Sequence, residues 1–81
     1  MPAVTTKTEI LEAAGYRYNF TRMVYFNQTA RKVFSVEAVE DNTEDWLQDR
    51  IAEENGDRGW CFYFNKRPSD AVRRELVNEL E

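Results

Sequence analysis

The stretch GWCFYFN at residues 59–65 contains the longest apolar run of an otherwise polar chain. Read as a β-strand, it sends successive side chains to opposite faces of a sheet. Three aromatic residues then share one face: Trp60, Phe62 and Phe64. We assign this face to the core, and we expect Cys61 and Tyr63 to meet whatever covers the other side of the sheet.

Length and composition predict one folded domain over residues 1–81 with a modest core. Hydrophobic residues make up 42% of the chain and charged residues 32%, which is typical of a soluble globular domain. The first residues lack a basic region followed by an apolar stretch, and no apolar run is long enough to span a bilayer. We therefore expect a small cytoplasmic protein without membrane contact.

The residues available for chemistry are few, because the chain has one cysteine and no histidine. The commonest zinc ligand and the usual acid–base group at neutral pH are thus missing. The three glycines lie apart, so no glycine-rich phosphate loop can be written. Cys61 lies in the middle of a predicted strand among aromatic residues, which is typical of a structural cysteine. We expect a protein that is not an enzyme and that binds no cofactor and no metal ion.

Capping signals divide the first half of the chain. Thr6 and Glu9 form a capping box that begins a helix, and Gly15 is placed to end it. Apolar alternation then predicts strands over residues 16–27 and 32–39. An odd connecting loop would put Phe26 opposite Lys32 and an even loop would reverse the faces, so the hairpin register stays open.

The second half contains two helices around the aromatic strand. Residues 41–43 supply caps for a helix over 44–54, which Asn55 and Gly56 end. A tight turn at residues 57–59 leads into the strand, and Pro68, Ser69 and Asp70 begin the last helix.

The predicted order is helix, strand, strand, helix, strand, helix. A right-handed crossover should leave the third strand parallel to the second. We expect a compact two-layer α+β domain, with a three-stranded, mainly antiparallel sheet of order 2-1-3 and the helices packed on it. The aliphatic residues expected to pack against the aromatic face of residues 60–64 are Leu47, Ile51, Val72, Leu76 and Leu80.

Charge is distributed unevenly along the chain. Residues 37–58 hold nine acidic and two basic residues, a net charge of −7, while the remainder carries +3, which together give −4. Within the predicted helix, Asp45, Asp49 and Glu53 lie four residues apart and so share one face. Like charges at this spacing cost a helix roughly 0.2–0.5 kcal/mol per pair, so helix stability does not explain the row.

Trp46 flanks this acidic row and could anchor an interface. We predict that an acidic helix binds a basic protein surface, which makes the protein an inhibitor or modulator, for instance of a nucleic-acid-handling protein. The residues assigned to this site are Asp41, Glu44, Asp45, Trp46, Asp49 and Glu53. The simpler alternative is a solvated helix face on which Trp46 covers the edge of the core and stacks on Arg50.

The second candidate surface is the sheet face that the helices would leave open. It would carry Met23, Tyr25 and Tyr63, with Arg31 near its margin, and could form a homodimer or stack the bases of single-stranded nucleic acid. The net charge of −4 disfavours nucleic acid as a direct ligand. A helix packed across this face would instead make three layers. A further alternative is that the chain is a subunit of a larger complex.

Overall fold

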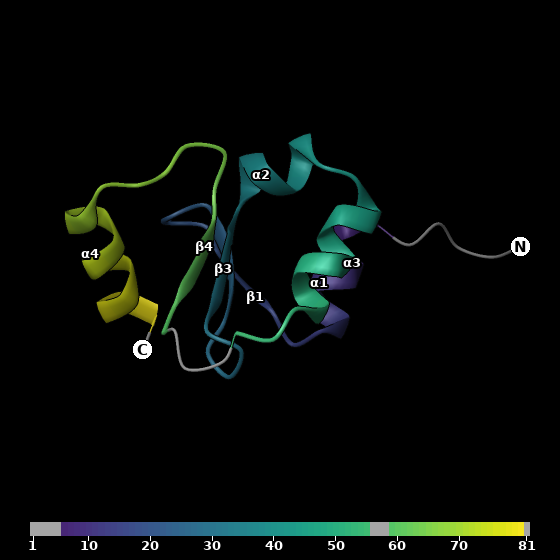
Figure 1. Ribbon diagram of the computed structural model, residues 1–81, viewed down its shortest axis with the longest axis horizontal. Coiled ribbons are helices and arrows are strands. Elements are labelled where there is room, and N and C mark those ends of the chain that lie inside the picture. Colours follow the sequence, from purple (N-terminus) through teal and green to yellow (C-terminus); the bar gives the residue numbers. More distant parts are fainter. Residues whose placement is uncertain (1–5, 56–58, 81) are drawn as a thin grey trace, which may run out of the picture.

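The computed structural model describes residues 6–55 and 59–80. Its elements follow in the order α1 (Lys7–Ala13), β1 (Arg17–Asn19), β2 (Val24–Asn27), β3 (Lys32–Ser35), α2 (Val36–Asp41), α3 (Glu44–Ala52), β4 (Cys61–Tyr63) and α4 (Asp70–Leu80). They form a compact α+β domain in which α1 and α3 cover one face of the sheet and α4 covers the other (Figure 1). The expected two-layer arrangement is therefore wrong, because both sheet faces are apolar enough to need a cover.

The sheet has four strands in the order β1-β2-β3-β4. The pairs β1–β2 and β2–β3 are antiparallel, and β3–β4 is parallel. The predicted parallel relation between the strands on either side of α3 is thus confirmed. The predicted sheet order 2-1-3 is wrong, because β4 pairs directly with β3 and the first predicted strand is not inserted between them.

That first predicted strand, residues 16–27, is interrupted by a turn. The Asn19 side-chain oxygen accepts a hydrogen bond from the backbone N–H of Arg22 at 3.1 Å, which closes the chain on itself. Met23 follows with a positive φ of 55°, so the backbone reverses before β2 begins. One long strand is replaced by the β1–β2 hairpin, which supplies the additional strand.

The predicted strand over residues 32–39 ends at Ser35, where α2 begins. The Ser35 hydroxyl accepts a hydrogen bond from the backbone N–H of Ala38 at 3.1 Å, and Ser35 itself remains extended. This is an ordinary helix N-cap. Alternation of apolar residues along this stretch could not distinguish the strand from the short helix that follows it.

The β2–β3 register resolves the alternative that the sequence left open. Asn27 is opposite Lys32 and Tyr25 is opposite Phe34, so the loop at residues 28–31 has an even length. Within this loop the Asn27 side-chain oxygen accepts from the N–H of Ala30 at 3.0 Å. Phe34 consequently faces α1 and α3, while its neighbour Val33 faces α4.

The core is divided by the sheet into two clusters of buried residues. The cluster beneath α1 and α3 contains Leu11, Tyr16, Phe34, Val39 and Leu47, with Ile51 packed against it. The cluster beneath α4 contains Val24, Val33, Leu76 and Leu80, with Trp60, Phe62 and Phe64 packed against it. The single predicted core is therefore separated into two, and Val72 is exposed.

Several predicted helix ends are confirmed. The Thr6 hydroxyl accepts from the N–H of Glu9, and the Thr43 hydroxyl from that of Trp46. Gly15 has a φ of 91°, and the N–H of Tyr16 returns to the Leu11 carbonyl at 2.9 Å. The predicted helix stop at Gly56 and part of the predicted turn at residues 57–59 lie outside the described residues.

Candidate functional site

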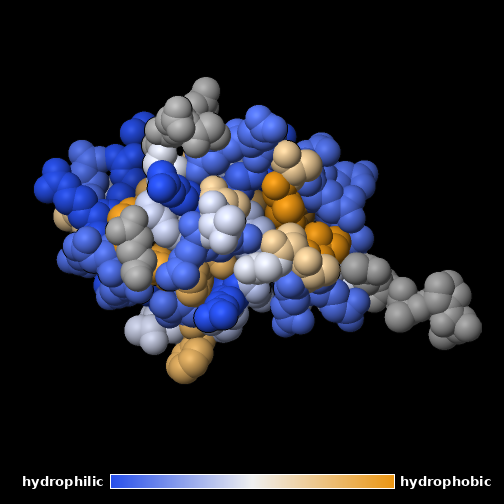
Figure 2. Space-filling view, turned by 90° about the horizontal axis from the view of Figure 1, so that it is seen from below, coloured by the Kyte–Doolittle hydropathy of each residue, from blue (hydrophilic) through white to orange (hydrophobic). Residues whose placement is uncertain are grey.

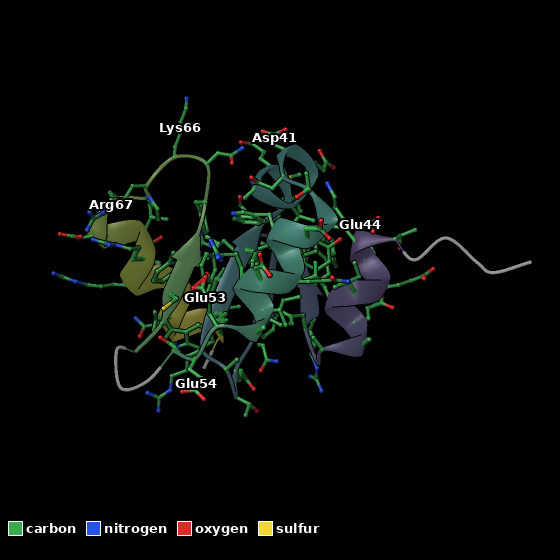
Figure 3. The ribbon with its side chains drawn as sticks, turned by 45° about the vertical axis from the view of Figure 1, so that its right-hand side comes forward. Asp41, Glu44, Glu53, Glu54, Lys66 and Arg67 are labelled. Atoms are coloured by element: carbon green, nitrogen blue, oxygen red, sulfur yellow. The ribbon has the colours of Figure 1, made fainter. Side chains whose placement is uncertain are left out.

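Four exposed carboxylates at the ends of α2 and α3 form what we call the acidic surface: Asp41, Glu44, Asp45 and Asp49. Glu44 at the start of α3 points outward (Figure 3), and Asp41 at the end of α2 accepts a hydrogen bond from the Asn65 side-chain nitrogen at 2.6 Å. Asp45 and Asp49 lie one turn apart on α3. None of the four is ion-paired with a Lys or Arg among the described residues. These four sequence-predicted acidic residues are thus exposed on two successive helices without an ion pair among the described residues.

Glu53 does not continue the row on α3. The helix ends at Ala52, and Glu53 has extended backbone angles of −64° and 137°. Its carboxylate forms an ion pair with Arg50. The predicted helical row of three acids is therefore reduced to Asp45 and Asp49, and the charge of Glu53 is partly neutralised.

The lysines nearest to α2 and α3 bind backbone carbonyls at the helix C-termini. Lys7 Nζ donates to the carbonyl oxygens of Val39, Glu40 and Asn42 at the end of α2. A cation stabilises a helix C-terminus because the last carbonyls lack partners and the helix dipole is negative there. This lysine is consequently used within the fold, and it forms no ion pair with the four carboxylates of the acidic surface.

Lys32 caps α3 in the same way, but from inside the molecule. Its side chain is 1% exposed, and Nζ donates to the carbonyls of Arg50 at 2.7 Å, Ile51 at 3.0 Å and Glu53. All three ammonium donors therefore have acceptors. Burial lowers the pKa of Lys32, and the nearby Glu53 carboxylate opposes this shift. A residue that the sequence placed at the start of a strand is thus a central polar contact between β3 and α3.

Trp46 is part of the core edge. Its ring meets Phe34 edge-on at 6.0 Å and Tyr63 edge-on at 6.4 Å, and Phe34 and Tyr63 stack at 4.6 Å. Such edge-to-face contacts are favourable arrangements of aromatic rings. The predicted interface anchor is therefore already engaged inside the fold, in line with the simpler alternative for this residue, in which Trp46 covers the core edge.

The second predicted surface is not assembled. Tyr25 and Tyr63 pack against the cluster beneath α1 and α3. Met23 is exposed at the turn before β2, and Arg31 is exposed in the loop before β3. These four residues do not share an open sheet face, because α1 and α3 cover the side on which the tyrosines lie (Figure 1).

Cys61 lies at a junction of hydrogen bonds. Its thiol donates to the Asn55 side-chain oxygen at 2.8 Å. The Asn55 amide nitrogen donates to the carbonyls of Ala30, Arg31 and Gly59. This contact ties the start of β4 to the β2–β3 loop. Across residues 6–55 and 59–80, no group of three or more Cys, Asp or Glu side chains is arranged to hold a metal ion.

Two adjoining hollows lie between β4, α4 and the segment that connects them. Their volumes are about 580 and 490 Å³, and both are lined by Trp60, Phe62 and Arg73. These aromatic residues were predicted to lie in the core, and they do pack against the cluster beneath α4, but the sequence did not indicate the groove that they line. The available signal was the pair Lys66-Arg67 shortly before Arg73-Arg74, which places four cations within nine residues.

Acidic residues of α4 are bound by an arginine of the β1–β2 turn. Arg22 donates from Nε and Nη2 to the Glu79 carboxylate at 2.7 and 2.6 Å, and Nη2 lies 3.5 Å from Glu75. The hydrogen bond from Arg22 lowers the pKa of Glu79. This bidentate contact fixes α4 against the turn.

Arg22→Gln should therefore change how stability depends on pH. Because the pKa of Glu79 is below its ordinary value of 4.5 in the folded state, its contribution to stability is present above pH 4.5 and is lost as the pH falls through the folded pKa. We expect the variant to be less stable than the wild type at neutral pH and to approach it in acid. Urea unfolding across this pH range measures the difference, and a gap that stays constant with pH would contradict the assignment.

The view from below shows a surface that is mostly hydrophilic, with hydrophobic side chains gathered in separate groups (Figure 2). No helix within the described residues is long and apolar enough to cross a membrane. Fold and surface together define a small three-layer α+β domain with an acidic region on α2 and α3. No protein-family model matches the chain, and no curated protein or solved structure shows a significant match to it.

Proposed function

We propose that the chain is a small non-enzymatic interaction domain that binds a basic protein surface through the acidic surface. The observation that carries this proposal is the unneutralised state of its carboxylates. They are exposed, while Lys7 and Lys32, the lysines that reach these helices, donate to backbone carbonyls. A partner's lysines or arginines would supply the missing counter-charges.

The local physics supports a role in recognition. Glu44 and Asp45 in the first turn of α3 are favoured by the helix dipole, but Asp49 is too far along the helix for that benefit and lies one turn from Asp45. Their repulsion costs roughly 0.2–0.5 kcal/mol. A cationic partner would relieve this cost on binding.

Electrostatic complementarity increases the association rate and the specificity more than the affinity. Because Trp46 is engaged in the core, the acidic surface lacks the large apolar anchor that the sequence suggested. We therefore expect fast association that weakens as salt screens the charges. A protein of this kind would inhibit or modulate its partner by occupying a surface that otherwise binds an anion such as nucleic acid.

Charge reversal tests the proposal. Affinity capture from native lysate identifies the partner, and association of the purified partner is then measured at low and high salt. Asp45→Lys/Asp49→Lys should slow association about tenfold or more at low salt and remove most of its salt dependence.

The matched control is Glu9→Lys/Glu12→Lys, which makes the same change in charge at two exposed positions of α1. Both variants place one lysine in the first turn of a helix, so their costs to folding are comparable. The control should stay within about twofold of the wild-type rate. Equal slowing by both variants, or capture of no partner, would overturn the proposal.

A further inference from the structure

The groove between β4 and α4 combines aromatic rings with arginines. We call it the α4 groove and define it by six residues: Trp60, Phe62, Phe64, Arg67, Arg73 and Arg74. Its helix, α4, lies on the face of the sheet opposite α1 and α3 (Figure 1). Arg67 lies at the α4 end of the molecule, far from Glu44 on the other side of the sheet (Figure 3).

The aromatic rings remain half-buried because α4 packs mainly on the centre of the sheet. Leu76 and Leu80 of the helix are buried with Val24 and Val33 of the inner strands. β4 is an edge strand, and the aromatic residues 60, 62 and 64 are half-buried beside it. Phe62 and Phe64 meet edge-to-face at 6.0 Å, which leaves part of their surface along the groove.

The charged side chains of α4 lie on two different sides of the helix. Arg22 draws Glu75 and Glu79 toward the β1–β2 turn. Arg73 and Arg74 line the groove, together with Asp70, which forms an ion pair with Arg73. Two of the three carboxylates of α4, those of Glu75 and Glu79, are thus held on another side of the helix, while Asp70 stays in the groove.

We propose that the α4 groove binds a short segment of single-stranded nucleic acid, with bases against the aromatic rings and phosphates beside Arg67, Arg73 and Arg74. Nucleotides are anions that also carry flat rings, so they match both features of the groove. Bases stack on aromatic side chains with little dependence on sequence, and arginine binds phosphate through two parallel hydrogen bonds. A duplex would keep its bases stacked on one another and away from the rings.

The net negative charge of the chain does not oppose this assignment at the groove itself. Salt screens charges beyond about 10 Å at 0.1 M, and α3, which carries three of the four carboxylates of the acidic surface, lies across the sheet from α4. The fourth, Asp41, is nearer and accepts a hydrogen bond from Asn65, which lines one of the hollows. Within the groove Asp70 offsets the charge of Arg73, whereas Arg67 and Arg74 form no ion pair among the described residues. This inference is independent of the proposed protein-binding role of α2 and α3.

Anisotropy of a labelled oligothymidylate reports binding to the full chain, and affinity should fall as salt rises. Arg67→Gln/Arg74→Gln should weaken binding about tenfold at low salt. The control Arg17→Gln/Arg31→Gln makes the same charge change at two exposed arginines that line neither hollow, and it should stay within about twofold. Circular dichroism and thermal unfolding confirm that each variant is folded.

Tryptophan fluorescence locates the bound bases. The chain has two tryptophans, so Trp46→Phe leaves Trp60 as the reporter. Oligothymidylate should quench Trp60 in a saturable way. Any one of three results would overturn the proposal: no binding at low salt, equal weakening by both double variants, or stronger binding of a duplex or a glutamate-rich peptide than of the oligothymidylate.

Discussion

Lys32→Met is expected to lower the free energy of unfolding by about 3 kcal/mol, because it removes a charged donor from three carbonyls at the end of α3. Methionine keeps a similar length and apolar stem but cannot donate. The carbonyls of Arg50, Ile51 and Glu53 would then lose their partner inside the fold. Urea unfolding followed by circular dichroism measures the loss.

Lys7→Met is the matched control. Lys7 caps α2 through the same kind of contact. Two of its three hydrogen bonds are partly buried and one is exposed, so water can replace the ammonium group there. We expect a loss of about 1 kcal/mol. The prediction would be contradicted if both variants lost the same free energy of unfolding, or if Lys32→Met lost less than about 1 kcal/mol. Either result would show that burial does not strengthen the contribution of the Lys32 hydrogen bonds to stability.

Trp46→Ala is expected to cost about 3 kcal/mol of stability, the lower end of the range for removing a large aromatic side chain, because Trp46 is half-buried. The edge contacts with Phe34 and Tyr63 would be lost and a cavity left at the core edge. Thermal or urea unfolding gives the change.

Partner binding separates a core residue from an interface anchor. At a temperature where Trp46→Ala is folded, association with the captured partner should stay within about twofold of wild type. Trp46→Phe keeps a ring against Phe34 and should recover most of the lost stability. A variant that is as stable as wild type but does not bind its partner would restore Trp46 to the role of anchor.

α3, with Asp45 and Asp49, and α4, with its groove, lie on opposite faces of the sheet (Figure 1). The two binding roles can therefore be separated by mutation. Asp45→Lys/Asp49→Lys should leave oligothymidylate binding intact, and Arg67→Gln/Arg74→Gln should leave the partner's association rate intact. Loss of one activity without the other identifies which surface binds which ligand.

Local capping chemistry was predictable, and the long strands were not. Thr6, Gly15 and Thr43 act on residues only a few positions away, so their patterns can be read directly from the chain. The turn after Asn19 and the helix cap at Ser35 lie inside apolar alternation that continues past them. Alternation reports burial on one face, and here it did not show where the strand ended.

The candidate site was predictable in part for the same reason. Asp45 and Asp49 lie one turn apart on a predicted helix, so their common face follows from the helix period. Glu53 does not continue the acidic row, because α3 ends at Ala52, where Lys32 donates hydrogen bonds to the last backbone carbonyls. The contacts of Trp46 could not be predicted from the sequence, because its partners Phe34 and Tyr63 lie on the distant strands β3 and β4.

The sequence by itself determined the helix signals at Thr6, Gly15 and Thr43, the parallel relation of β3 and β4 and the uneven charge along the chain, because each depends on neighbouring residues or on a general rule of connection. Only the tertiary structure decided which sheet face each aromatic residue occupies, since the even loop at residues 28–31 sets the register. The tertiary structure also decided which charged side chains are bound within the fold. Lys32 is drawn to the end of α3, and Arg22 reaches Glu79 across 57 positions of sequence. Such pairings arise only when packing brings distant side chains within hydrogen-bonding distance.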